Sequence, residues 1–179
     1  MVQIEIQADG SLFVVGVLSG SFVLAHINAG GSLDSSFGSG GMVLIQDNVV
    51  FRGGVNDGGI RLAVQSDGKL LTVGDASIGG TFQLRFRRFL PHGEVDTSFG
   101  SNGVRTLGDL PREFGYFSTG LAIAEPGGGF TLTAVSLFDG GTYLLLRVTS
   151  DGNLDPTFGG VGYVSGFDVG NPHDVPVRL

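Results

Sequence analysis

Three aspartates share one sequence context and are the residues most able to do chemistry. Each lies three residues before a Phe-Gly pair, at Asp34, Asp96 and Asp155. Carboxylates with such spacing either ligate calcium or accept backbone N–H groups within a turn. Residues 151–155 imitate the opening of an EF-hand loop, but Pro156 stands where that loop needs Gly and Gly162 where it needs a bidentate Glu. The pattern favours turn aspartates, and no metal ligand and no cofactor is predicted.

One aligned position, eight residues before each of these aspartates, holds His26, Arg88 or Arg147. The forked guanidinium of Arg matches a carboxylate in a partly buried loop. We therefore expect Arg88 and Arg147 to reach Asp96 and Asp155 within their own segments. These pairs are interpreted as internal struts and not as ligand sites.

The remaining histidines and acids predict no catalytic residue. His26, His92 and His173 do not have metal-binding spacing. His92, Glu94 and Asp96 lie close together, but other residue types occupy the aligned positions elsewhere in the chain. Glu94 and Asp96 remain a close acidic pair on a loop expected to be exposed, which is weak support for glycosidase chemistry.

Other chemical signatures are missing. Neither G-x-G-x-x-G nor the phosphate-binding G-x-x-x-x-G-K-(S/T) occurs. Residues 75–79 contain a Ser but lack the first Gly of a nucleophile elbow. The chain has no Trp and 3 Tyr, which leaves few flat rings for stacking on sugars or bases.

The composition predicts a turn-rich, acidic chain. Glycine makes up 33 of 179 residues, well above the usual share of about 7%. The net charge of −7 disfavours nucleic acids and anionic membranes as partners. Cysteine is absent, which excludes disulfides and thiolate chemistry. No apolar run approaches the roughly 18 residues of a membrane span, and residues 1–10 lack a signal-peptide pattern.

The elements that position these residues come from an internal repeat. Three segments align, beginning at Gln7, Gln65 and Glu125, with separations of 58 and 60 residues. Each continues through a turn and a Gly or Ala to a Phe-Gly pair, with a further Gly three residues after that Gly. Coincident spacings of this kind indicate one structural unit used three times.

Each repeat predicts four short strands. In the second copy these are 60–64, 69–73 (ending at Gly74), 82–90 and 104–107, and the first copy gives 2–6, 12–15, 22–28 and 42–46. Asp67-Gly68 predicts a tight hairpin, and the alternation from Phe82 to Arg87 predicts a strand with one drier face. No segment has a sustained helical period.

About 60 residues and four antiparallel strands per repeat predict an all-β fold, a β-propeller with three blades. The blades are expected at 2–47, 60–108 and 119–168, within a single repeat domain covering 1–179, with 169–179 as a further repeat or a closing segment. Phe37, Phe99 and Phe158 are expected to wedge between neighbouring blades. The Gly after each Phe is expected to relieve a positive φ or a close backbone approach.

The sequence also resembles a known family, the bacterial delta-60 repeat. The resemblance rests on Gln65-Ser66-Asp67-Gly68-Lys69-Leu70 with Gly74, and on Gly31-Ser32-Leu33-Asp34 with Phe37-Gly38. It covers nearly the whole chain, although the third copy replaces the first Asp-Gly with Gly127-Gly128. The resemblance implies a propeller-type repeat of large surface or secreted proteins, an extracellular location and no catalytic residue.

Two functions stay open. The first is a non-enzymatic propeller module for scaffolding, adhesion or protein interaction, with an unknown protein or glycan ligand. The second is a hydrolase or lyase with its active site in a central channel. Polar residues of the variable connections would distinguish them if they gathered at a channel mouth; these are Asp57, Asp75, Asp109, Glu113, Asp139 and His173.

Closure of the ring is a separate question. Propellers typically have about four to eight blades, and the chain encodes three. The end blades are expected to expose apolar side chains, among them Val14, Phe22, Leu144 and Leu146. We therefore expect either a homodimer of two arcs or missing blades supplied by a longer parent protein.

Overall fold

The computed structural model describes residues 3–18, 21–45, 60–78, 81–108, 110, 117–136 and 142–167 of the chain. Every regular element within these ranges is a β-strand. The strands are β1 (Gln3–Ile6), β2 (Leu12–Leu18), β3 (Ser21–Ile27), β4 (Met42–Ile45), β5 (Arg61–Val64), β6 (Leu70–Ile78), β7 (Thr81–Phe89), β8 (Val104–Leu107), β9 (Phe117–Ala124), β10 (Phe130–Ser136), β11 (Tyr143–Val148) and β12 (Tyr163–Phe167).

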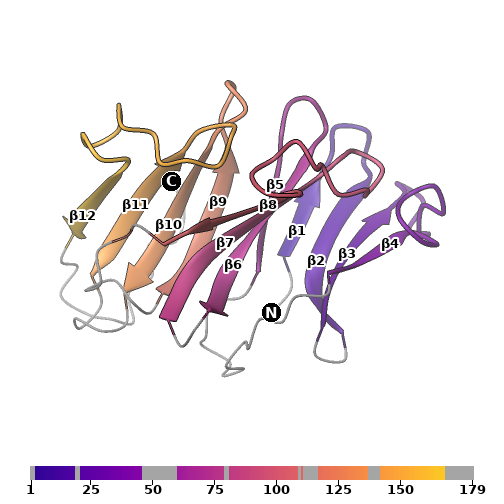
Figure 1. Ribbon diagram of the computed structural model, residues 1–179. Coiled ribbons are helices and arrows are strands. Elements are labelled where there is room, and N and C mark those ends of the chain that lie inside the picture. The colour runs from indigo at the N-terminus through magenta and orange to yellow at the C-terminus, as the bar shows by residue number, and fades with distance from the viewer. Residues whose placement is uncertain are drawn as a thin grey trace.

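The strands form three four-stranded antiparallel sheets, each a meander of consecutive strands. We call them blade 1 (β1–β4), blade 2 (β5–β8) and blade 3 (β9–β12), and Figure 1 shows them side by side. The predicted all-β fold of three propeller blades is confirmed. The described strands span 3–45, 61–107 and 117–167, and the segment 169–179 lies outside the described residues. No described helix is long and apolar enough to cross a membrane.

The predicted Asp-Gly hairpin forms between β5 and β6. Gly68 has a φ of +80°, and its N–H donates to the Gln65 carbonyl at 2.9 Å. Glycine adopts this left-handed backbone without steric cost, which is why the turn falls there. The Lys69 ammonium donates to the Asp67 carboxylate across the same turn at 2.8 Å.

The second strand is longer than predicted in the first and second repeats. In blade 2 it does not end at Gly74, because Gly74 pairs with Arg85 and the ladder continues to Ile78, which pairs with Thr81. Blade 1 behaves alike, with β2 running through Gly16 to Leu18. Glycine also accepts extended backbone, and the ladder hydrogen bonds do not depend on its side chain, so Gly alone does not end a strand.

The hydrophobic core lies between the blades. One cluster joins blades 1 and 2 and consists of Phe13, Val15, Phe22, Leu24, Phe37, Ile45, Ile60, Leu62, Leu70 and Phe89. The other joins blades 2 and 3 and consists of Ala63, Leu71, Val73, Leu84, Phe86, Phe99, Leu107, Ala122, Phe130, Leu132, Ala134, Leu144, Leu146 and Val148. Stability therefore depends on blade-to-blade contact, as expected for a repeat protein.

The apolar residues exposed at the two ends of the arc are not the predicted ones. Phe22, Leu144 and Leu146 are buried and Val14 is half-buried. Successive side chains of a strand point to opposite faces, and the three buried ones lie on the face that meets the neighbouring blade. The exposed side chains include Ile4 and Ile6 of β1 and Leu121 and Ile123 of β9, at 54%, 75%, 45% and 51% exposure.

Candidate functional site

The recurring aspartates are turn residues, as predicted. The backbone N–H and the hydroxyl of Ser36 both donate to Asp34 Oδ1, at 3.0 and 2.7 Å. Ser98 makes the same two bonds to Asp96, and Thr157 makes them to Asp155. Each carboxylate thus stabilises the turn that positions the Phe three residues after it. Within the described ranges no group of three or more His, Cys, Asp or Glu side chains is placed to hold a metal ion.

These hydrogen bonds make the turn carboxyls more acidic. The Ser36 hydroxyl and backbone N–H, with a further bond from His26, lower the pKa of Asp34 from its usual value to about 2. The pKa of Asp155 is lowered by the same bonds from Thr157. Burial raises the pKa of Asp96, but hydrogen bonds from Ser98 and the charge of Arg88 outweigh that effect and lower it.

Replacing Ser36 with alanine is expected to raise the pKa of Asp34 towards its usual value, because the largest stabilising bond to the carboxylate is removed. A lowered folded-state pKa contributes stability above the unfolded pKa, and this contribution is lost as the pH falls through the folded value of about 2. The destabilisation caused by Ser36→Ala should therefore be present at neutral pH and fade on acidification towards pH 2.

Urea unfolding of both proteins across this pH range, together with carboxyl NMR titration of Asp34, measures the effect. Ser35→Ala is the matched control, since Ser35 is exposed and adjacent. A Ser36→Ala effect that does not change with pH would contradict the linkage between the turn and Asp34 ionisation.

The aligned cation position differs in geometry between the blades. Arg88 Nε donates to Asp96 Oδ2 at 2.8 Å, so the predicted pair in blade 2 is confirmed. His26 makes the equivalent bond through Nδ1 to Asp34 Oδ2 at 2.9 Å. For Arg147 the predicted contact is wrong: its Nε has no hydrogen-bond partner, and it acts on Asp155 through its charge alone. Arg147 lies over the Phe158 ring, 4.6 Å from the centroid.

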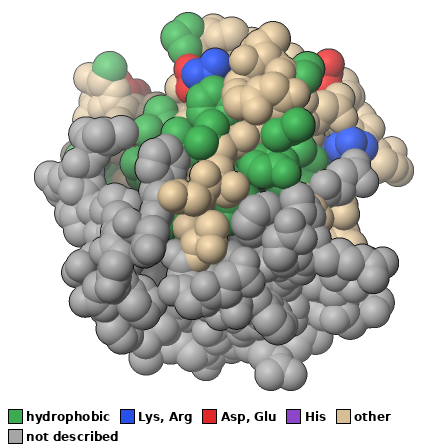
Figure 2. Space-filling model, turned by 90° about the vertical axis from the view of Figure 1, so that its left-hand side faces the viewer, with side chains coloured by type: hydrophobic (Ala, Val, Ile, Leu, Met, Phe, Trp, Pro, Cys, Tyr) green, Lys and Arg blue, Asp and Glu red, His purple; other side chains and the backbone are tan. Residues whose placement is uncertain are grey.

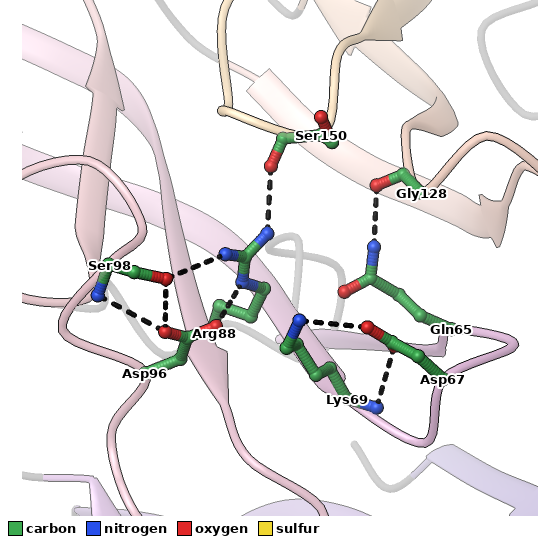
Figure 3. Close-up of polar contacts among 8 residues, drawn as sticks. All are labelled: Gln65, Asp67, Lys69, Arg88, Asp96, Ser98, Gly128 and Ser150. Carbon is green, nitrogen blue, oxygen red and sulfur yellow. Dashed lines mark hydrogen bonds and ion pairs between the residues drawn. The ribbon is translucent and has the colours of Figure 1, made fainter.

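Two residues of blade 2 at recurring positions of the repeat, Arg88 and Gln65, also form hydrogen bonds to blade 3. A second nitrogen of Arg88, Nη1, donates to the Ser150 carbonyl at 2.8 Å (Figure 3). Gln65, which opens the repeat, donates from Nε2 to the Gly128 carbonyl at 2.5 Å in the same view. Both acceptors are backbone oxygens in the hairpin turns of the next blade. We call such a set of contacts between consecutive blades a joint.

Two further residues, Gln3 and Arg61, belong to the joints and were not predicted from the sequence. The Gln3 side chain pairs with the backbone of Leu62, donating to its carbonyl at 2.8 Å and accepting from its N–H at 3.0 Å. Arg61 Nε donates to the Gly120 carbonyl. Gln3 lies four residues before Gln7, and Arg61 lies four residues before Gln65. A polar side chain that recurs at this position of the repeat could therefore have indicated a contact between blades.

Phe37 and Phe99 wedge between neighbouring blades, as predicted, whereas Phe158 has no further blade to pack against among the described residues. Phe37 and Phe99 are 1% and 0% exposed. Each packs under a glycine of the next blade, Phe37 under Gly93 and Phe99 under Gly152. A Cβ on Gly152 would lie 2.7 Å from Phe99 Cζ, so the joint requires glycine there. The glycines after Phe37 and Phe99 have φ of +54° and +56°, which confirms their expected role.

The other candidate residues do not form one site. The His92 carbonyl accepts from the Gly38 N–H at 2.8 Å, which places this loop in the joint between blades 1 and 2. Glu94 is exposed but Asp96 is buried, so the pair is not the exposed acidic pair expected, because Arg88 draws Asp96 inward. The backbone of Ser77 lies within β6, where no nucleophile elbow forms. Of the polar residues in the variable connections, the side chain of Asp75 is not described, and Asp57, Asp109, Glu113, Asp139 and His173 lie outside the described residues, as does Gly79.

Blade 3 carries Arg147, Asp155 and Phe158 at the aligned positions, but Glu125 in place of the recurring Gln, beside a groove of about 360 Å³. The groove is lined by Glu125, Pro126, Gly127, Gly129, Arg147, Val148, Thr149, Ser150 and Asp155. Glu125 accepts from the Thr131 hydroxyl within its own blade, at 2.5 Å. Phe158 is only half-buried, in contrast to Phe37 and Phe99.

Consecutive four-stranded meanders with their core between the sheets define the β-propeller class of repeat proteins. A family model described as "Domain of unknown function (DUF5122) beta-propeller" matches residues 7–37, 65–99 and 133–158, together more than half of the chain. The chain belongs to this family of propeller-type repeats. No curated protein and no solved structure matches it.

Proposed function

We propose that this β-propeller domain is a non-enzymatic module for scaffolding, adhesion or protein interaction within a larger bacterial surface or secreted protein. The observation that supports it is the use made of the recurring polar residues. Gln65 and Arg88 are bonded to the next blade, and Asp34, Asp96 and Asp155 hold the turns. The residues that recur with the repeat thus build the blades and their joints.

The resemblance to delta-60 repeats supports the extracellular location and the larger parent protein. The net charge of −7 supports ligands other than nucleic acids and anionic membranes. A protein or glycan ligand would be bound on the blade surfaces and loops, as is usual for a rigid scaffold that presents variable connections.

The competing hydrolase or lyase function is tested by product formation. The purified chain is incubated with a panel of neutral and acidic polysaccharides, and released reducing ends and unsaturated sugars are measured. The control variant carries Asp57→Asn, Asp75→Asn, Asp109→Asn, Glu113→Gln, Asp139→Asn and His173→Gln. We expect no more product from the unmodified chain than from this variant. Turnover that the six substitutions abolish would overturn the proposal.

A further inference from the structure

We propose that the two ends of the arc are the two halves of one further joint, and that a second copy of this chain occupies each half. In this assembly blade 3 of one copy docks on blade 1 of the other, twice, giving a closed ring of six blades. Six lies within the usual range for propellers. The occupant follows from a comparison of the internal joints with the two ends.

The first half of the joint lies on blade 3. The Phe158 ring, with Arg147 stacked over it, stands where Phe99 and Arg88 stand in blade 2. In blade 2 these two residues receive a hairpin turn of the next blade, through Gly152 and the Ser150 carbonyl. The groove beside Arg147 is the corresponding place on blade 3.

The second half lies on blade 1, where Gly31 aligns with Gly93 and Gly152. All three have positive φ, +84°, +90° and +82°. A Cβ on Gly93 or Gly152 would meet the Phe of the preceding blade at 3.1 or 2.7 Å, whereas a Cβ on Gly31 would have no atom within 4 Å. Gly31 therefore leaves open the position where a Phe ring of another blade would pack, and we call this position the seat. The Ala29 carbonyl, aligned with that of Ser150, is the matching acceptor for Arg147.

The first strands add apolar surface to both halves. Ile4 is 54% exposed, while the aligned Leu62 and Ala122 are 0% and 5% exposed because a preceding blade covers them. On blade 3, Leu121 occupies the position that holds Gln3 and Arg61 in the other blades, and it is 45% exposed. Figure 2 views the molecule from the side of β11 and β12, where hydrophobic side chains gather.

An apolar residue at the position of Gln3 and Arg61 distinguishes this joint from the internal ones. Gln3 and Arg61 bond to backbone groups, whereas Leu121 can contribute only apolar contact, for which Ile4 and Ile6 of a second copy are suitable partners. One contact does not carry over, since Glu125 cannot donate to a carbonyl as Gln65 does. The two ends thus complement one another. Blade 3 supplies the Phe158 ring and the Arg147 donor, blade 1 supplies the open position at Gly31, and each supplies an apolar first strand. A glycan or an unrelated protein would not match this set of contacts.

Sedimentation equilibrium of the full chain at micromolar concentration tests the assembly. We expect twice the chain mass of 18.5 kDa. Ile4→Lys would place an ammonium in an apolar contact, and Gly31→Asn would fill the seat with a residue that tolerates positive φ. Each variant is expected to weaken dimerisation at least about tenfold.

Two matched variants act as controls. Val161 is also 54% exposed, but it aligns with Asn102, which stays exposed in blade 2, so Val161→Lys should change dimerisation by less than about threefold. Gly30→Asn should behave likewise, because Gly30 aligns with the exposed His92 and Asp151.

A monomer at all accessible concentrations would overturn the proposal, and so would an open series of larger assemblies. A dimer that tolerates Ile4→Lys and Gly31→Asn would place the contact elsewhere and overturn it as well. Circular dichroism confirms that each variant is folded. The polysaccharide assay measures products and this experiment measures mass, so either proposal can fail without the other.

Discussion

Replacing Phe99 with alanine is expected to lower the free energy of unfolding by about 3–5 kcal/mol, the usual cost of removing a fully buried Phe. The ring is 0% exposed and belongs to the cluster that joins blades 2 and 3. Its loss also removes the surface over which the Arg88 guanidinium lies, 4.7 Å from the ring centroid. The single substitution therefore weakens the packing of blade 2 against blade 3.

Phe158→Ala is the matched variant, because Phe158 has the same place in the repeat but no following blade in the described chain. The ring is half-buried, and the expected cost is less than about 1.5 kcal/mol. Both variants are made in the Ile4→Lys background, so that a second copy cannot cover Phe158. Urea unfolding followed by circular dichroism gives the two values. Equal costs would show that the ring stabilises its own turn and not the joint.

The repeat made much of this architecture predictable. The spacing of Asp-Gly turns and Phe-Gly pairs was enough to predict four strands per blade, and the alternation in β7 correctly separated buried Leu84 and Phe86 from half-buried Gln83. The turn role of the aspartates was also predictable, because it depends on residues only two positions apart in the chain. Such local features repeat whenever the sequence does.

Contacts between blades were less predictable. The apolar residues exposed at the arc ends could not be identified from the sequence. Both faces of these blades carry apolar side chains, and the sequence does not say which neighbouring blade covers each face. Gln3 and Leu62, 59 residues apart, meet only because blade 2 follows blade 1 in space. Arg147 does not form the contact with Asp155 that Arg88 forms with Asp96. The position of such an arginine depends on contacts with the following blade as well as on its own repeat, as the bond from Arg88 to Ser150 shows.

The same dependence predicts unequal effects at two glycines with nearly the same backbone. Gly152→Ala and Gly31→Ala both place a Cβ at a positive φ, +82° and +84°, which costs about 1–2 kcal/mol in each case. Only at Gly152 does that Cβ also meet the preceding blade, at 2.7 Å from Phe99 Cζ and 2.9 Å from Arg105 Cγ. Overpacking of this kind adds about 1–3 kcal/mol.

Gly152→Ala is therefore expected to be more destabilising than Gly31→Ala by about 1–3 kcal/mol, measured by urea unfolding in the Ile4→Lys background. The shared φ cancels in the comparison, so the difference reports the steric contact at the joint. Combining Gly152→Ala with Phe99→Ala provides the further control, because the smaller side chain leaves space for the new methyl group. The double variant should then cost less than the sum of the two single substitutions. Equal costs at Gly31 and Gly152, or strict additivity in the double variant, would mean that Phe99 is not seated against Gly152 in solution.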